Sequence, residues 1–230
     1  MSENKRTALI TGGSAGFGRA LARALAARDW NLIVTARGAE RLERVRAETG
    51  ATAIQGDVTD PGHIWKIAEA LRATGRLDLV VNNASRLGPS PMPRLAEFPI
   101  DELATVYQTN VLAPLAILQT TLPYLRASHG VAVDVSSDAA VNAYEGWGGY
   151  GSSKAALDHL TAIIAAENTD VPIYSFDPGD MRTDMHQAAF PGEDISDRPE
   201  PESVVPALLR LLETRPASGR FVAAQLLVSA

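Results

Sequence analysis

Short apolar runs alternate with longer amphipathic segments along the whole chain, and the two kinds of segment have the lengths of strands and helices. The apolar runs predict strands at residues 8–10, 31–36, 51–55, 77–81, 130–135, 171–176 and 220–228. The amphipathic segments predict helices at residues 19–28, 39–48, 61–74, 101–128, 150–168 and 203–214. Because parallel strands need crossover connections, this alternation predicts an α/β fold, a doubly wound parallel sheet of about seven strands with helices on both faces.

Two segments interrupt this alternation. Residues 86–99 contain four of the chain's prolines and predict a loop, and residues 184–202 carry six acidic residues and predict an exposed loop. A bend near Pro114 is expected within the helix at 101–128. The chain shows no internal repeat and no linker, so we expect residues 1–230 to form a single domain.

The composition excludes several classes of protein. The 230 residues are 46% hydrophobic, which is enough for a sizeable core, and the net charge of −6 without a basic block argues against a nucleic-acid binder. Cysteine is absent and the four histidines lack metal-ligand spacing, so neither a disulfide nor a metal is expected. No apolar run approaches the ~18 residues of a membrane span and no signal peptide is evident, so we expect a cytoplasmic protein with no membrane partner.

A glycine-rich turn joins the first predicted strand to the first predicted helix. Gly12, Gly16 and Gly18 follow the strand at 8–10 directly, with the spacing G-x-x-x-G-x-G. Glycine allows positive φ or close approach of a ligand, and the backbone amides and dipole at a helix N-terminus favour a phosphate. A phosphate-binding turn is therefore predicted, and a glycine-rich turn without a ligand is the alternative.

Distinctive polar residues follow several of the other predicted strands. They are Asp57 after the third strand, Asn82-Asn83 after the fourth, Ser136-Ser137 after the fifth and Pro178-Gly179 after the sixth. In an open parallel sheet, ligands bind outside the carboxyl ends of the strands. The positions of these residues predict that they gather around one binding site.

Tyr150 and Lys154 form a second candidate site. At i and i+4 their side chains share one helix face, and a nearby ammonium stabilises a phenolate and lowers the phenol pKa toward the working range. Ser137 lies thirteen residues upstream at a strand end, where its hydroxyl could polarise a carbonyl group. An ordinary pair on a helix surface is the alternative for an isolated Tyr-x-x-x-Lys.

Taken together, these motifs resemble the short-chain dehydrogenase/reductase family over nearly the whole chain. The matches, in chain order, are Thr11-Gly12-x-x-x-Gly16-x-Gly18, Asp57, Asn82-Asn83-Ala84, Asn110, Ser137, Tyr150-x-x-x-Lys154, and Pro178-Gly179 with Thr183. The resemblance implies a Rossmann-like fold and hydride transfer between a nicotinamide cofactor and a carbonyl/alcohol pair. Reduction of a ketone or aldehyde is the predicted reaction.

The resemblance also implies a role for each site residue. Tyr150 would be the general acid in reduction and the base in oxidation, and Ser137 would orient and polarise the substrate oxygen. Lys154 would lower the Tyr150 pKa and hold the nicotinamide ribose, and Asn110 would support a water-linked proton relay to Lys154. The implied cofactor-binding residues are Gly12, Ser14, Gly16, Phe17, Gly18, Arg37, Asp57, Val58, Asn83, Ala84, Tyr150, Lys154, Pro178, Gly179, Met181 and Thr183.

The end of the second predicted strand indicates which cofactor is bound. An acidic residue there would favour a ribose 2′-hydroxyl, but this stretch has no carboxylate and ends in Arg37, whose planar guanidinium suits a 2′-phosphate. NADP(H) is therefore predicted over NAD(H). Arg37 could instead be a solvated arginine, and Arg41 could either assist or lie on the surface.

Some residues leave alternatives open. Ser136 is a rival for Ser137, although the spacing to Tyr150 favours Ser137, and Tyr144 lacks a lysine four residues on. Tyr144 and Trp147 would shape the substrate pocket or simply pack in their loop. Asp134, between valines, is expected to be hydrogen-bonded structurally.

The chain also departs from the family pattern. Ser85 stands where the family usually has glycine, and Gly148-Gly149 before Tyr150 predicts unusual flexibility. By resemblance, residues 184–202 would form a substrate lid. The long helices at 103–128 and 150–168 would form the contacts of a homodimer or homotetramer. The alternative functions are a nucleotide-binding sensor without turnover, and a lyase, epimerase or dehalogenase-like activity on the same scaffold.

Overall fold

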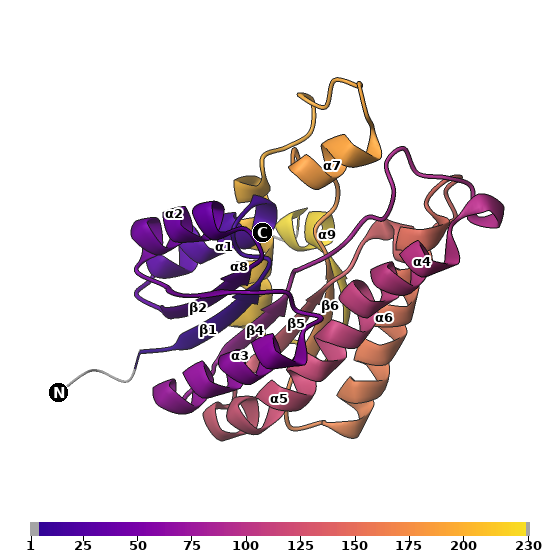
Figure 1. Cartoon of the computed structure of the whole chain (residues 1–230). Coiled ribbons are helices and arrows are strands. Elements are labelled where there is room, and N and C mark those ends of the chain that lie inside the picture. Colours follow the sequence, from indigo (N-terminus) through magenta and orange to yellow (C-terminus); the bar gives the residue numbers. More distant parts are fainter. Residues whose placement is uncertain (1–4, 229–230) are drawn as a thin grey trace.

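The computed structural model describes residues 5–228, and within them seven parallel strands form one sheet in the order β3-β2-β1-β4-β5-β6-β7 (Figure 1). The strands are β1 (Thr7–Thr11), β2 (Asn31–Ala36), β3 (Thr52–Gln55), β4 (Leu79–Asn82), β5 (Val131–Val135), β6 (Ile173–Asp177) and β7 (Gly219–Val222). The strand order reverses between β1 and β4, so the predicted doubly wound parallel sheet is confirmed.

Helices cover both faces of the sheet. The α-helices are α1 (Gly16–Ala26), α2 (Ala39–Thr49), α3 (Pro61–Thr74), α4 (Ile100–Tyr107), α5 (Ala113–Ser128), α6 (Gly148–Glu167), α7 (Asp184–Ala189), α8 (Val205–Thr214) and α9 (Ala223–Val228). Short 3₁₀ turns lie at Leu95–Glu97, Asp138–Ala140 and Pro201–Ser203. Helices α1, α2 and α8 pack on one face, and α3, α5 and α6 on the other.

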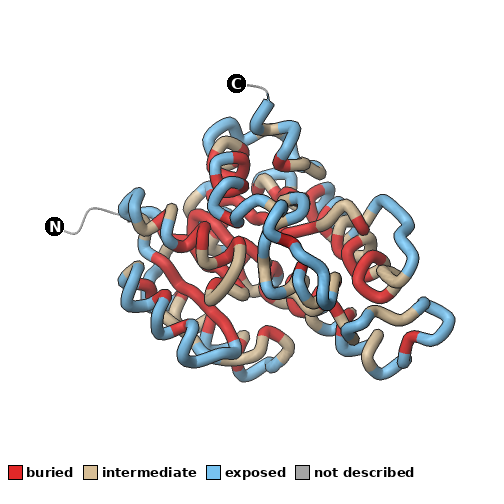
Figure 2. Tube along the Cα trace, turned by 90° about the horizontal axis from the view of Figure 1, so that it is seen from above, coloured by how far each residue is buried: buried red, intermediate tan, exposed pale blue. Residues whose placement is uncertain are grey.

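The alternation of side chains along each strand builds two cores from one sheet. In β1, Ala8 and Ile10 join the core under α1 and α8, whereas Leu9 joins the core under α3 and α5. The β1 backbone is buried on both sides, as is usual for a central parallel strand. Figure 2 shows the buried residues concentrated along the middle of the molecule.

The long predicted helix at 101–128 is not continuous. Residues Gln108–Leu112 form a π-helical turn between α4 and α5, so the break lies before Pro114 rather than at it. Proline has no amide hydrogen to donate to the carbonyl of the residue four positions earlier, here Asn110, which disfavours a regular α-helical turn at this point. The irregular turn places Asn110 inside the molecule, where its side chain is fully buried.

Two other predicted segments need correction. The predicted strand at 220–228 is only the short strand β7, and the residues after it form α9, because Ala223–Val228 contains good helix formers with helical spacing. The predicted loop at 184–202 begins with the helix α7, whose N-terminus is capped by the Thr183 hydroxyl accepting a hydrogen bond from the His186 amide. This segment rises above the carboxyl edge of the sheet in Figure 1.

Candidate active site

A pocket of about 610 Å³ lies along the carboxyl edge of the sheet. Segments that follow six of the strands, β1 to β6, line it, and so does α7. Of the residues predicted for the site from the sequence, all line this pocket except Gly18, Asn82 and Asn110. The topology therefore brings the separate sequence motifs together at one place.

The glycine turn after β1 is held by tight packing against the segment after β4. Gly12 has a φ of +62°, and a Cβ there would lie 2.8 Å from the Ala84 Cα, while a Cβ on Gly18 would lie 2.5 Å from the Asn83 Nδ2. The Asn83 amide donates to the carbonyls of Thr11 and Gly12 at 3.0 and 3.1 Å. Gly18 and Asn83 thus hold the glycine turn in its conformation.

The N-terminus of α1 faces the pocket and has no side-chain cap. Its first amides therefore have no side-chain acceptor, and together with the helix dipole they suit an anion. Gly16 begins this helix with a φ of +48°, which favours glycine, and a Cβ there would lie 3.2 Å from the Thr183 side chain. The arrangement fits the pyrophosphate of a dinucleotide.

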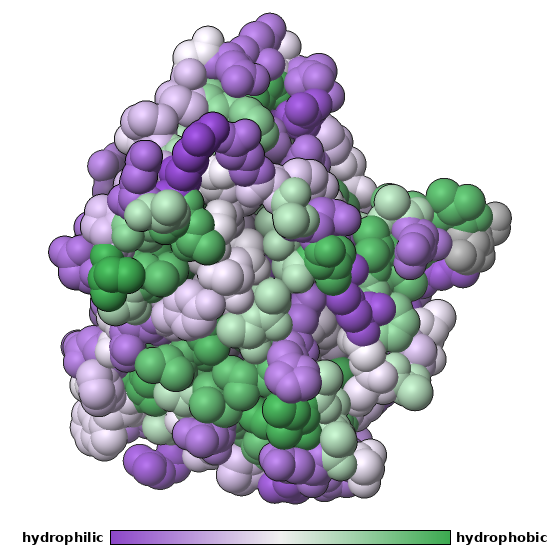
Figure 3. Space-filling view, turned by 90° about the vertical axis from the view of Figure 1, so that its right-hand side faces the viewer, coloured by the Kyte–Doolittle hydropathy of each residue, from purple (hydrophilic) through white to green (hydrophobic). Residues whose placement is uncertain are grey.

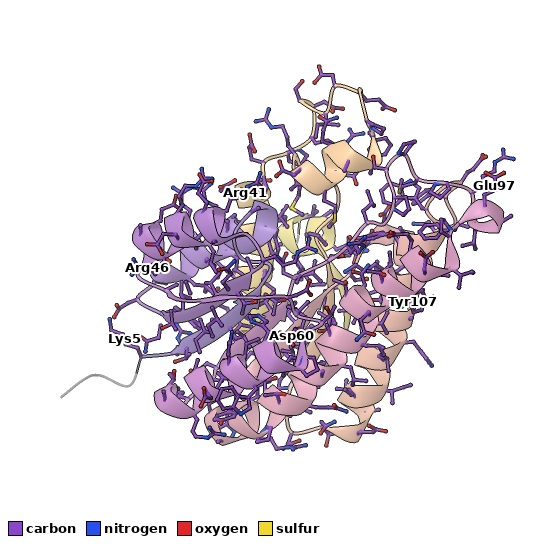
Figure 4. All side chains as sticks on the ribbon, in the orientation of Figure 1. Lys5, Arg41, Arg46, Asp60, Glu97 and Tyr107 are labelled. Carbon is purple, nitrogen blue, oxygen red and sulfur yellow. The ribbon has the colours of Figure 1, made fainter. Side chains whose placement is uncertain are left out.

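Charged side chains gather where β2 and β3 end. The exposed Arg37 guanidinium lies 4.0 Å from the Asp57 carboxylate, and Arg41 pairs with Asp184 at the start of α7 at 2.5 Å. Figure 4 shows Arg41 on the side of α2 that faces the α7 segment. Although burial acts in the opposite direction, hydrogen bonds donated by Thr59 and the charge of Arg37 hold the pKa of Asp57 below its usual value.

Tyr150 and Lys154 lie on the inner face of α6, and both are buried. The Lys154 Nζ is 5.6 Å from the centroid of the Tyr150 ring and donates a hydrogen bond of 2.6 Å to the Val135 carbonyl. Burial lowers the pKa of Lys154 to about 8, against the attraction of the Asp134 and Asp158 carboxylates.

The pKa of Tyr150 departs from its usual value in the direction opposite to the sequence-based expectation. Burial raises the pKa of Tyr150 to about 12, although the neighbouring hydroxyls of Ser85 and Ser137 act to lower it. The expectation considered only the neighbouring ammonium and left out the cost of placing a phenolate in a buried site. In the protein alone, the phenol is therefore neutral at physiological pH.

The two rival serines at the end of β5 are distinguished by their contacts. The Ser137 hydroxyl stands beside the Tyr150 phenol, lines the pocket and donates to the Asp138 carboxylate at 3.1 Å. The Ser136 hydroxyl is buried without a hydrogen-bond partner. Tyr144, the rival tyrosine, is exposed and donates to the Asp138 carboxylate at 2.8 Å.

Asn110 lies behind the pocket and connects two of its segments. Its Nδ2 donates to the Arg86 carbonyl and the Ser153 hydroxyl, both at 2.9 Å, and its Oδ1 accepts from the Arg86 amide at 2.8 Å and the Ser85 hydroxyl at 3.1 Å. Asn110 thereby ties the segment after β4 to α6. Its expected part in a relay to Lys154 stays a prediction.

A partly buried ionic cluster beside the site was not predicted from the sequence. The Arg220 guanidinium donates to the Asp158 carboxylate at 3.0 Å, to the Asp177 carboxylate at 2.8 Å and to the Ser137 carbonyl at 3.0 Å. These partners come from α6, β6 and the end of β5, so no local pattern in the sequence could indicate the cluster. Asp134 accepts hydrogen bonds from side chains on β4 and α6, which fits its expected structural role.

Aromatic and apolar side chains form one wall of the site next to Tyr150. The Trp147 ring lies 5.9 Å from the rings of both Tyr150 and Phe190, and Leu87 and Ala189 complete the same cluster. Trp147 lines the pocket, as one of the two alternatives for it predicts. The wall joins α6 to the α7 segment.

With this geometry, the comparisons with known proteins assign the class. Residues 6–194 match the family model described as short chain dehydrogenase, and the chain belongs to that family. It is an NAD(P)-dependent oxidoreductase.

Two curated relatives illustrate the range of the family. Serine 3-dehydrogenase of Agrobacterium fabrum is 36% identical over 185 residues, which cover 78% of this chain and 73% of the relative. Sepiapterin reductase of Xenopus tropicalis is 30% identical over 232 residues, which cover 93% of this chain and 85% of the relative.

Solved structures show the same fold. A short chain dehydrogenase of Shigella flexneri complexed with NADP superposes with a TM-score of 0.87 at 29% identity and covers 95% of this chain and 97% of its own. An alcohol dehydrogenase of Thermococcus sibiricus complexed with 5-hydroxy-NADP gives a TM-score of 0.84 at 28% identity, with 95% of each chain covered.

Two further findings concern the described part of the chain only. Among residues 5–228, no group of three or more His, Asp or Glu side chains is placed to hold a metal ion. No helix in that range combines the length and the apolar character needed to cross a membrane.

Proposed function

We propose that this protein is an NADP(H)-dependent reductase that converts a ketone or aldehyde into an alcohol, in a reversible reaction with Tyr150 as the general acid. The observation that carries the proposal is the neutral Tyr150 phenol, which lines the pocket beside the hydroxyl of Ser137 and the ammonium of Lys154. A neutral phenol holds the proton that carbonyl reduction consumes.

The residues of this chain account for the proton half of the reaction. When bound, the reduced nicotinamide cofactor would supply the hydride to the carbonyl carbon. Tyr150 donates its phenolic proton to the carbonyl oxygen, and the Ser137 hydroxyl donates a hydrogen bond to the same oxygen. The phenolate left on Tyr150 is stabilised by the Lys154 side chain, which is mainly protonated at pH 7 because its pKa is about 8.

The preference for NADP(H) is supported by the charges at the ends of β2 and β3. Arg37 lines the pocket and is exposed, so its guanidinium has room for a bidentate phosphate contact. One oxygen of the Asp57 carboxylate accepts two hydrogen bonds from Thr59, and the other oxygen lies 4.0 Å from the Arg37 guanidinium. An NAD(H)-preferring alcohol dehydrogenase is the alternative.

Two further parts of the proposal concern the pocket and the assembly. Residues 184–202 serve as a substrate lid, because Met185 and Ala189 of α7 line the pocket. The assembly is a homodimer or homotetramer through α5 and α6, since the face in Figure 3 has broad apolar areas and Leu112 and Ile163 are exposed. Residues 1–230 form one domain in this proposal.

The test is oxidation of NADPH and NADH by the wild-type protein with a panel of ketones and aldehydes, followed at 340 nm. We expect turnover with NADPH, and at least a thousandfold loss of kcat in Tyr150→Phe, with NADPH affinity nearly unchanged. Tyr144→Phe, which removes the rival phenol, is the control and keeps its activity. Turnover that survives in Tyr150→Phe contradicts the assigned acid, and cofactor binding without turnover on any carbonyl compound indicates a sensor.

A further inference from the structure

Ser85 occupies a position beside Tyr150 that the resemblance to the family does not explain. It follows β4 directly after Asn83-Ala84, in the place where a glycine is expected, and it lines the pocket. Its hydroxyl stands beside the Tyr150 phenol, where it acts to lower the pKa of that phenol, and it donates to the Asn110 Oδ1 at 3.1 Å. A glycine at this position could make neither contact.

The orientation of the Asn110 amide determines where the hydrogen of the Ser85 hydroxyl points. The Arg86 backbone amide can only donate, and it donates to Oδ1 at 2.8 Å, while the Arg86 carbonyl can only accept, and it accepts from Nδ2 at 2.9 Å. Oδ1 is thus fixed as an acceptor facing Ser85. While Tyr150 is neutral, Ser85 therefore donates its hydrogen to Asn110 and can present only a lone pair to the neighbouring phenol.

Loss of the phenolic proton changes this arrangement without moving the backbone. A phenolate has no hydrogen to donate and needs donors, and the Ser85 hydroxyl supplies one by rotation about its Cβ–Oγ bond. Asn110 Oδ1 keeps the Arg86 amide as a donor, so it is not left without a partner. A hydrogen bond to an ionised acceptor is roughly twice as strong as a neutral one, so the exchange favours the phenolate.

We propose that Ser85 is a further catalytic residue of this site, which alternates its hydroxyl hydrogen between Asn110 and Tyr150 as Tyr150 loses and regains its proton. It acts in addition to Ser137, which stands beside the same phenol. Asn110 acquires a second task beyond any relay to Lys154, because it holds the Ser85 hydrogen in the neutral state. This inference rests on the proposed function of Tyr150 as the proton donor.

The test measures the ionisation of residue 150 directly and does not depend on turnover. Tyr150 is replaced by 3,5-difluorotyrosine, whose free phenol ionises well below that of tyrosine, and ¹⁹F NMR of the full-length protein follows its titration. Ser85→Ala and Ser85→Gly each remove one donor to the phenolate, so the pKa of this residue is expected to rise by about one pH unit. Ser85→Thr keeps a hydroxyl and is expected to restore the wild-type value.

Ser152→Ala is the matched control, because Ser152 lies on the same helix and its hydroxyl donates to the Gly149 carbonyl. We expect no change in the titration of residue 150 in this variant. An unchanged or lowered pKa in both Ser85→Ala and Ser85→Gly overturns the proposal. Ser85→Gly also guards against a folding artefact, since glycine is the residue that the family pattern places there.

A second measurement uses the native Tyr150 and the reverse reaction. Alcohol oxidation requires the phenolate, so at a fixed pH below the pKa its kcat/KM is expected to fall about tenfold in Ser85→Ala and Ser85→Gly. The Kd for NADP⁺ stays within twofold of the wild-type value, and Ser85→Thr recovers the rate. If the wild-type protein oxidises no alcohol, the proposed function fails, whereas the ¹⁹F titration still decides the role of Ser85.

Discussion

At the scale of single residues, burial dominates the chemistry of the site. It raises the pKa of Tyr150 to about 12 and lowers that of Lys154 to about 8, so each shift favours the neutral form of its group. The two shifts have opposite consequences for function. In the proposed mechanism, the first shift keeps a proton on Tyr150, and the second makes it costly to hold the positive charge that would stabilise a phenolate.

Removing that buried charge is expected to make the protein more stable while abolishing its activity. Because the pKa of Lys154 falls from 10.5 to about 8 on folding, the folded protein at pH 7 still carries the charge, but at a cost in stability. At about 1.4 kcal/mol per pH unit, and after the lost hydrogen bond to Val135, Lys154→Met should raise the free energy of unfolding by about 1–3 kcal/mol. Chemical denaturation at pH 7 measures this gain.

The pH dependence of the gain separates it from a packing effect. Between pH 8 and 10.5, the unfolded wild-type chain binds more protons at Lys154 than the folded chain does, so wild-type stability rises with pH in this window. The advantage of Lys154→Met should therefore shrink toward pH 10. Lys66→Met, at an exposed lysine of α3, is the control and shows neither the gain nor its decline. A gain that is constant from pH 7 to 10 contradicts the prediction.

How much of the site the sequence could predict depends on the distance between partners along the chain. Tyr150 and Lys154 are four residues apart on one helix, so their spacing alone places them together. The contact of Ser85 with Asn110 spans 25 residues, and that of Arg220 with Ser137 spans 83, so both depend on how the elements pack. Ser137 and Tyr150 are an intermediate case. They lie on different elements, but the family resemblance indicated from their thirteen-residue spacing that both belong to the site.

At the scale of elements, the glycines before Tyr150 serve close packing rather than flexibility. A Cβ on Gly148 would lie 2.8 Å from the Leu95 Cβ, and one on Gly149 would lie 2.4 Å from the buried Phe98 ring. The first turn of α6 is thus pressed against the 86–99 loop. The sequence showed two adjacent glycines but could not show the ring against them, which comes from about fifty residues earlier in the chain.

Adding a methyl group at this contact should disturb both stability and activity. In Gly149→Ala, the Phe98 ring must move, and overpacking of this kind costs about 1–3 kcal/mol, more than the ~1 kcal/mol that alanine contributes to a helix. The free energy of unfolding should fall, and kcat should fall with it because Tyr150 is the next residue. Urea denaturation and steady-state kinetics measure the two effects.

The Phe98→Ala background provides the control for this prediction. Without the ring, the added methyl group has space, so Gly149→Ala should be neutral or stabilising there. Equal losses in the two backgrounds would show that the Phe98 contact is not the cause. The effect of Gly149→Ala is measured in the wild-type protein and in Phe98→Ala under the same conditions and with the same substrate.

The predicted elements were most accurate where local signals are strong. Helix α3 runs from Pro61 to Thr74 as predicted, with the Asp60 cap and the proline in its first turn. The run at 220–228 failed because an apolar run of that length fits a strand and a short helix equally well. The π-helical turn at Gln108–Leu112 depends on packing around Asn110 and had only Pro114 as a local signal.

At the scale of the whole molecule, the sheet gathers its function at one edge. The pocket extends across the point where the strand order reverses, between β1 and β4, with Arg37 toward one end and Tyr150 toward the other. A dinucleotide that fills it would contact segments of the sequence from Gly12 to Thr183. Binding should therefore stabilise the molecule as a unit.

This coupling provides a test of cofactor preference that needs no substrate. At one hundred times its Kd, NADPH is expected to add about 2.7 kcal/mol to the free energy of unfolding, and NADH at the same concentration should add less. Arg37→Ala should weaken NADPH by tenfold or more and leave NADH unaffected. Thermal unfolding with each cofactor measures both effects.

Arg44→Ala, at an exposed arginine of α2 that pairs with Glu40, is the matched control and should respond to NADPH as the wild-type protein does. Greater stabilisation of the wild-type protein by NADH than by NADPH would refute the preference. An Arg37→Ala response to NADPH equal to that of the wild-type protein would assign the phosphate to other residues.

The ion pair between Arg41 and Asp184 joins segments that are 143 residues apart in the sequence. Arg41 lines the pocket near Arg37, so in the proposed complex a 2′-phosphate and the Asp184 carboxylate compete for one guanidinium. Occupancy at the nucleotide end then loosens the segment over the substrate end, and by reciprocity an opened segment admits the nucleotide more tightly. For the proposed reaction we therefore expect an ordered kinetic mechanism, in which the coenzyme binds first, the carbonyl compound second, and the oxidised coenzyme leaves last.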